Sequence, residues 1–146
     1  MLSMDLFRNE AEKIRADHDK RGIPHERIDQ VIELDEQWRG ALKEMEEGRR
    51  ERNQAARGIA DAKKSGNKEE ADRIMAQVKD LGDRIAALDE KANSLLEERD
   101  RIRMRIPNLL HDAVPKGDDE SGNTQHSLHG DKPEFEFEPR THNELI

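Results

Sequence analysis

The chain has no cysteine and no tyrosine, and only one Trp and three Phe among its 146 residues. Without cysteine it forms no disulfide and no thiolate zinc site, which fits a reducing compartment, and we expect a cytoplasmic location. With 41% charged and 32% hydrophobic residues, the sequence offers little material for a globular core. It is therefore poorly suited to enclosing a small substrate.

Long apolar runs are also missing. The longest, Ile85–Leu88, has four residues, whereas a membrane-spanning helix needs about 20. The sequence therefore predicts no membrane span, no membrane partner and no signal-peptide core.

The middle of the chain lacks the acidic excess of the rest. The formal net charge is −8, but residues 46–85 carry ten Lys and Arg against nine Asp and Glu. Phosphate contacts depend on charge within a Debye length of roughly 8–10 Å, so this local balance matters more than the total. The segment is a candidate for nucleic-acid binding, although a solvated face with ion pairs is the commoner origin of mixed charge.

Two apolar stripes run in mirror order on either side of Ser65-Gly66-Asn67. In both, the positions step alternately by three and four residues, which is the spacing of a left-handed coiled-coil seam. The first stripe comprises Ile28, Val31, Asp35, Trp38, Leu42, Met45, Arg49, Arg52, Ala56 and Ile59. The second comprises Ile74, Val78, Leu81, Ile85, Leu88, Ala92, Leu95, Arg99, Ile102 and Ile106.

Folding the chain back at Gly66 pairs the stripes layer by layer, because the residue numbers of each pair sum to 133 or 134. Ile59 then lies opposite Ile74. Arg99, the one polar residue of the second stripe, faces Asp35, the one acidic residue of the first. We predict Asp35 and Arg99 as a structural pair, since a buried polar contact disfavours slipped alignments. The fold class is all-α: a long antiparallel two-helix coiled-coil hairpin, with arms of roughly 55–60 Å.

Three regions follow from this pattern. Residues 1–24 form an N-terminal helix, residues 25–106 form the coiled-coil arm with its turn at 65–67, and residues 107–146 form an extended linker rich in Pro, Gly, Asp and Asn. The alternating stretch 135–137 is the only strand candidate in the linker. A tail of this length without regular structure suggests that it leads into a domain absent from this chain.

Capping signals predict where the helices begin and end. We expect the first helix over residues 4–20, with Asp5 as its N-cap. Pro24 suits the first turn of the next helix. Asn67, followed three residues later by Glu70, resembles a capping box that opens the return helix.

No constellation for catalysis or metal binding stands out. Pairs of acids occupy helix faces that are expected to be exposed, and no Gly-rich phosphate loop follows a strand. We therefore expect no catalytic residue, no metal site and no cofactor in this chain. Without cysteine partners, the histidines of the linker are expected to be solvated rather than metal ligands: His111, His126, His129 and His142.

Several blocks of sequence resemble one known family. The chain is similar to the N-terminal region of seryl-tRNA synthetases along essentially its whole length. The blocks that carry the resemblance are Leu34-Asp35-Glu36-Gln37-Trp38-Arg39, Glu51-Arg52-Asn53, Lys63-Lys64-Ser65-Gly66, Ile106-Pro107-Asn108-Leu109-Leu110-His111, Val114-Pro115-Lys116-Gly117 and Phe135-Glu136-Phe137-Glu138-Pro139.

The resemblance implies a parent enzyme, a serine–tRNA ligase of class II. In this family the hairpin recognises the long variable arm and elbow of tRNA(Ser), typically serving the active site of the other subunit of a homodimer. ATP and Mg belong to the catalytic domain, whose motifs would lie beyond Ile146. The resemblance therefore implies that this chain binds and positions RNA without performing chemistry.

Long cationic side chains suit recognition of RNA by shape and phosphate, because the A-form major groove is too narrow for side chains. We predict RNA contacts on one face of the outgoing helix, over the tip, and down the return helix. For each residue, a solvated surface charge is the alternative. The candidates are Arg50, Asn53, Arg57, Lys63, Lys64, Lys68, Arg73 and Lys79.

A purely mechanical coiled coil is the alternative function. It would serve as a spacer, or as an interaction module resembling a prefoldin tentacle, without RNA binding. A prefoldin-like module would need β-hairpins between its helices and an apolar tip. The tip here, residues 63–67, reads Lys-Lys-Ser-Gly-Asn and offers neither.

Overall fold

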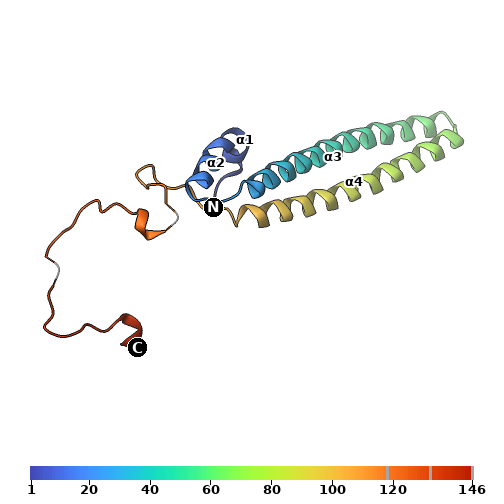
Figure 1. The fold of residues 1–146 in the computed structure, drawn as a ribbon. Helices are drawn as coiled ribbons and strands as arrows, with labels where there is room; N and C mark the ends of the chain where they lie inside the picture. Colours follow the sequence, from blue (N-terminus) through green and yellow to red (C-terminus); the bar gives the residue numbers. More distant parts are fainter. Residues whose placement is uncertain (118, 132, 146) are drawn as a thin grey trace.

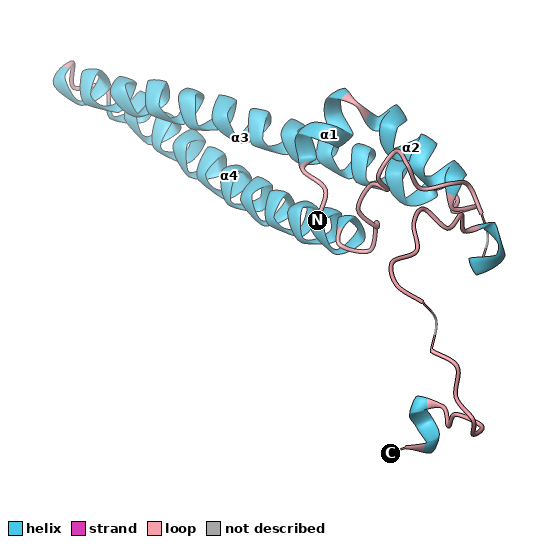
Figure 2. Cartoon of the chain, turned by 90° about the vertical axis from the view of Figure 1, so that its left-hand side faces the viewer, coloured by secondary structure: helices cyan, strands magenta, loops and turns pink. Residues whose placement is uncertain are grey.

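The computed structural model describes residues 1–117, 119–131 and 133–145. Its elements are α1 (Met4–Asn9), α2 (Ala11–Lys20), α3 (Glu26–Lys64), α4 (Lys68–Arg103) and two short 3-10 helices, η1 (Glu120–Gly122) and η2 (His142–Glu144). The helices α3 and α4 lie side by side and antiparallel, and α1 and α2 pack at the open end of this hairpin (Figures 1 and 2). The described residues contain no strand, so the predicted all-α hairpin is confirmed. No helix within these ranges is long and apolar enough to cross a membrane.

A tight reversal joins the two long helices at residues 65–67. Gly66 adopts a positive φ of 74°, which glycine reaches without steric cost. The Asn67 side chain then accepts a hydrogen bond from the backbone N–H of Glu70 at 3.2 Å. This N-cap satisfies one of the free donors at the start of α4.

The seam between α3 and α4 keeps most of the predicted positions, Arg52 and Ile59 included, but beyond Met45 every second position shifts by one residue. Gly48 is buried, whereas Arg49, the predicted seam residue, is exposed. A Cβ at Gly48 would lie 3.2 Å from Cγ1 of Ile85, so the two helices approach each other closely there. The prediction was wrong at this point because small residues, not only large apolar ones, occupy a seam where backbones come close.

The same shift continues to the tip of the hairpin. Half-buried Ala55 and buried Ala62 face α4, whereas Ala56 is exposed. A Cβ at half-buried Gly58 would lie 3.3 Å from Cδ1 of Ile74. On the α3 side, the distal seam therefore contains several glycines and alanines, which face the larger residues Ile74 and Ile85 of α4.

The N-terminal region differs from the predicted continuous helix. The backbone breaks at Glu10, with φ −139° and ψ 33°, which separates α1 from α2. Ser3, not Asp5, caps α1, since its side chain accepts a hydrogen bond from the N–H of Leu6 at 3.4 Å. The helix α3 begins at Glu26, so Pro24 precedes its first turn.

The break lets α1 and α2 pack on the base of the hairpin. The main apolar core of the molecule lies there rather than along the arm. It draws on α1, α2, α3 and the residues just after α4, and consists of Leu2, Phe7, Ile14, Ile28, Val31 and Ile106. Burying these side chains fixes α1 and α2 to the base of the hairpin.

After passing α2, the described part of the C-terminal segment leads away from the hairpin (Figure 1). Residues 135–137, the strand candidate of the linker, form no strand, and residues 136 and 137 lie in a bend. Alternation alone makes no strand without a neighbouring strand to take up its backbone hydrogen bonds. The rings of Phe135 and Phe137 lie 5.2 Å apart, and both side chains are exposed.

Candidate nucleic-acid interface

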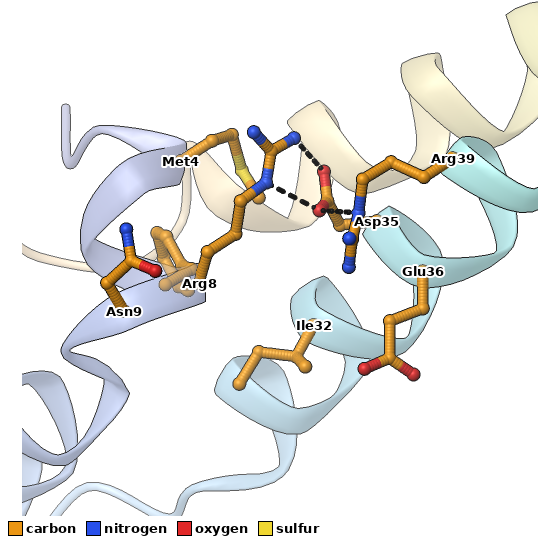
Figure 3. A pocket seen from close by; sticks show the side chains of 8 residues that line it. Met4, Arg8, Asn9, Ile32, Asp35, Glu36 and Arg39 are labelled. Atoms are coloured by element: carbon orange, nitrogen blue, oxygen red, sulfur yellow. Dashed lines mark hydrogen bonds and ion pairs between the residues drawn. The ribbon is translucent and has the colours of Figure 1, made fainter. Parts of the chain in front are cut away.

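The base of the hairpin holds a charged cluster around one buried carboxylate. Asp35, on α3, is 1% exposed. Arg8 of α1 binds both of its oxygens at 2.8 Å, through Nε and Nη2. Arg39 Nε donates to Oδ2 at 3.0 Å, and Arg99 Nη1 of α4 donates to Oδ1 at 2.8 Å. Figure 3 shows Arg8 and Arg39 reaching this carboxylate from α1 and α3.

The expected contact between Asp35 and Arg99 is therefore present, with two partners that sequence spacing missed. The hydrogen bonds from Arg8, followed by its charge, hold the pKa of Asp35 below its usual range, although burial acts in the opposite direction. In return, the hydrogen bond to Asp35 raises the pKa of Arg8. Arg39 could have been suspected from its i,i+4 spacing to Asp35, but nothing in the sequence pointed to Arg8.

Arg99 is itself buried, at 5% exposed, and fully occupied. Its Nε and Nη2 donate to Asp100 at 3.1 and 3.0 Å. Its guanidinium carbon lies 5.1 Å from the centre of the Trp38 ring, a cation–π distance. These contacts tie Arg99 to the hairpin itself and leave it no role toward an external ligand.

A second polar contact joins α2 to the segment after α4. Buried Asp17 accepts hydrogen bonds from Arg21 Nε at 2.8 Å and from the backbone N–H of Leu110 at 2.6 Å. Arg21 Nη2 also donates to the carbonyl of Asn108 at 2.7 Å. Sequence reasoning missed this clamp, which sets the direction in which the chain leaves the hairpin.

The eight predicted RNA-contact residues all lie in the distal part of the hairpin, and all are exposed. Arg50, Asn53, Arg57 and Lys64 lie on the face of α3 that points away from α4, because they fall midway between the buried seam positions. Within the described ranges, only one of the eight forms an ion pair. That residue is Arg73, whose Nη2 lies 3.4 Å from Glu70 Oε1.

Arg73 is also set apart by its position. It lines a shallow groove between α3 and α4 together with two acidic residues, Glu51 and Glu70. None of the other seven candidates lines this groove. The structure therefore does not bring all eight residues onto one surface.

The histidines of the C-terminal segment do not converge. His111, His126, His129 and His142 are all exposed. Across the part of the chain that the structure describes, no group of three or more His, Cys, Asp or Glu side chains is arranged to hold a metal ion.

Comparison with known proteins decides the family. The family model described as "Seryl-tRNA synthetase N-terminal domain" matches residues 1–110. The chain belongs to the seryl-tRNA synthetase N-terminal domain family. The chain is 38% identical over 146 residues to the serine–tRNA ligase of Staphylococcus saprophyticus and 36% identical to that of Staphylococcus haemolyticus. These matches cover the whole chain but only 34% of each relative.

Solved structures agree with this membership. Seryl-tRNA synthetase from Pyrococcus horikoshii, solved in complex with ATP, matches 83% of the chain with a TM-score of 0.78 at 33% identity. The match covers 27% of that protein. The serine–tRNA ligase of Naegleria fowleri, in complex with AMP, has a TM-score of 0.78 over 97% of the chain and 37% of its own length. At 21% identity, this second likeness concerns the fold alone.

Proposed function

We propose that this seryl-tRNA synthetase N-terminal domain binds tRNA(Ser) and positions it for ATP-dependent formation of seryl-tRNA. The hairpin would contact the long variable arm and the elbow of the tRNA. The catalytic step would belong to a class II domain that follows this chain. We also propose that the parent enzyme is a homodimer, so that the arm of one subunit serves the active site of the other.

One observation carries this proposal: exposed cations gather at the far end of a rod. Lys63, Lys64 and Lys68 surround the turn, and within the described ranges none of the three forms an ion pair. A cation that forms no ion pair within the protein is free to contact a phosphate and to release its counterions, which is the main source of affinity in RNA backbone recognition. The matches to serine–tRNA ligases support this choice of partner.

The described residues do not fit ATP or Mg²⁺. A triphosphate site needs backbone N–H groups or cations converging on one cavity, and Mg²⁺ needs carboxylate oxygens. The groove beside Arg73 offers one cation next to two acids, and no three His, Cys, Asp or Glu side chains of the described ranges are placed together to hold a metal ion. We infer that both ligands bind in the catalytic domain of the parent enzyme.

A titration of the 146-residue chain tests the proposal. The measurement is filter binding to tRNA(Ser) at several salt concentrations, with a tRNA that lacks a long variable arm as control. We expect tighter binding to tRNA(Ser), with an affinity that falls steeply as salt rises. Equal binding to both tRNAs, or none at low salt, would favour the mechanical spacer.

A variant links the binding to the tip. We expect Lys63→Ala with Lys64→Ala to flatten the log–log salt slope by roughly one unit for each phosphate that the variant no longer binds. The matched control is Lys13→Ala with Lys20→Ala on α2, which removes the same charge far from the tip. An unchanged slope in the tip variant would remove these two lysines from the interface.

A further inference from the structure

The hairpin has two unequal flanks, one on each side of the plane that contains the axes of α3 and α4. One of them carries the groove described above. The groove flank is defined here by residues that recur every seven positions, or about two turns, on each helix: Glu44, Glu51 and Gly58 on α3, and Glu70, Gln77 and Arg84 on α4, with Arg73 beside them.

The cations of the groove flank each lie beside an acid. Arg73 pairs with Glu70 at 3.4 Å, and Arg84 Nη2 lies 3.9 Å from Glu44 Oε2 across the two helices. Glu51 adds a further negative charge to the groove. A phosphate approaching from this side would meet acids and paired arginines.

The opposite flank has a different character. Arg49 and Lys63 each follow a buried seam residue, Gly48 and Ala62, by one position, so they lie across the seam from the groove flank. On α4, Met75 follows the half-buried seam residue Ile74 in the same way. The basic flank is defined here by Arg49, Ala56 and Lys63 on α3 and by Lys68, Met75, Lys79 and Gly82 on α4, with one acid, Asp72, seven residues before Lys79.

This basic flank combines positive charge with small side chains. Arg49, Lys63, Lys68 and Lys79 form no ion pair within the described ranges, and all are exposed. Between them lie the small residues Ala56 and Gly82 as well as exposed Met75. A nucleic-acid backbone can approach such a surface closely, and the cations at its edges can reach phosphates.

The basic flank continues toward the base of the hairpin. A shallow depression beside Arg49 is lined by Arg39, Lys43 and one acid, Glu46. Arg39 also lines the pocket between α1 and α3 that holds Arg8; its Nε contacts Asp35, while about half of its side chain stays exposed (Figure 3). From Arg39 to Lys63 the helix rises about 36 Å, so the flank offers an extended track rather than a point contact.

We propose that the RNA backbone lies along the basic flank, from the tip toward Arg39, and that the groove flank faces away from it. This inference rests on the proposed function and deepens it. It adds Arg49 to the contact residues and removes Arg73 from them. The charge pairs on the groove flank then stabilise the arm without taking part in binding.

Two charge-matched variants of the 146-residue chain test the inference. Arg49→Gln with Lys63→Gln alters the basic flank, and Arg73→Gln with Arg84→Gln alters the groove flank. Both remove two positive charges. With tRNA(Ser), we expect the basic-flank variant to bind at least tenfold more weakly, with a log–log salt slope about two units shallower. The groove-flank variant should keep the parent's slope.

Two uncharged substitutions test whether the shape of each flank, apart from its charge, affects RNA binding. Ala56→Phe places a bulky side chain on the basic flank, and Gln54→Phe places one beside the groove. We expect only Ala56→Phe to weaken binding, by about tenfold. Helicity and melting temperature, measured for all four variants, show whether each has folded.

The outcomes separate this inference from the proposed function. A parent chain that binds tRNA while the two flanks respond equally, or the groove flank responds more, overturns the inference and leaves the proposed function standing. A parent chain that binds no tRNA at low salt overturns both. Weaker binding confined to the basic-flank variant and Ala56→Phe supports the assignment.

Discussion

At the scale of single residues, Asp35 organises the base of the molecule. Its carboxylate receives guanidinium groups from α1, α3 and α4, which no other residue links in this way within the described ranges. Removing any one arginine leaves Asp35 with two partners. Removing Asp35 leaves Arg99 buried with only Asp100 to balance its charge.

We therefore expect Asp35→Ala to lower the free energy of unfolding by about 3 kcal/mol or more, the range found when one partner of a buried ion pair is removed. Urea denaturation followed by circular dichroism measures it. The matched control is Asp29→Ala, because Asp29 is exposed and its pair with Arg15 lies at the surface. This control should stay within about 0.5 kcal/mol of the parent. Equal destabilisation of both variants would contradict the central role of Asp35.

The same carboxylate predicts a pH dependence. Hydrogen bonds from Arg8 lower the pKa of Asp35 in the folded state, while the unfolded chain keeps a value of about 3.9. A depressed folded pKa adds stability that is fully present above the unfolded value and is lost as the pH falls toward the folded value. The stability difference between the parent and Asp35→Asn should therefore shrink as the pH falls below about 4. Denaturation curves from pH 7 to pH 2 measure it, and a constant difference would show that Asp35 titrates alike in both states.

At the scale of helices, close packing of α3 on α4 depends on which glycines lie at the interface between them. A Cβ at Gly40 would meet nothing within 4 Å, whereas one at Gly48 would lie 3.2 Å from Ile85. Alanine favours a helix over glycine by about 1 kcal/mol, but overpacking a seam typically costs about 1–3 kcal/mol. The change in stability caused by each Gly→Ala substitution therefore depends both on helix propensity and on steric overlap with the facing helix.

We expect Gly40→Ala to stabilise the hairpin by about 0.5–1 kcal/mol and Gly48→Ala to be at least about 1 kcal/mol less stable than Gly40→Ala. Chemical denaturation of the two variants beside the parent measures both values. The two substitutions are chemically identical and differ only in what the new methyl group meets. A Gly48→Ala variant as stable as Gly40→Ala would show that the helices are farther apart than the structure has them.

Sequence periodicity predicted most of these elements. The three-and-four spacing gave the two long helices and their antiparallel order, and the Asn67 cap followed from its spacing to Glu70. Periodicity missed the shift at Gly48, because a residue without a side chain carries no hydropathy signal. It also missed the break at Glu10, which depends on α1 and α2 packing together on the base rather than on local preference.

The candidate site was less predictable than the fold. Exposed cations could be identified from their helical spacing, but their division between two flanks depends on which side of the seam each one occupies. The one-residue shift after Met45 moved Arg49 out of the seam and onto the basic flank. The contacts of Arg8 with Asp35 and of Asp17 with Leu110 join segments that are far apart in sequence, so no local sequence pattern predicts them.

At the scale of the whole molecule, the described structure is a rod with a packed base and a charged tip. Its apolar core lies at one end, where α1 and α2 cover the hairpin, and the arm beyond it consists of α3 and α4 alone (Figures 1 and 2). The buried Asp35–Arg99 contact crosses the hairpin near this base. Such a shape suits a partner that is held along its length rather than enclosed.

Hydroxyl-radical footprinting of tRNA(Ser), with and without the chain, tests this account most directly, because it maps the riboses that a bound protein covers. We predict protection along the long variable arm and the elbow, and none at the anticodon. Protection confined to the anticodon, or absent at saturating protein, would contradict the account.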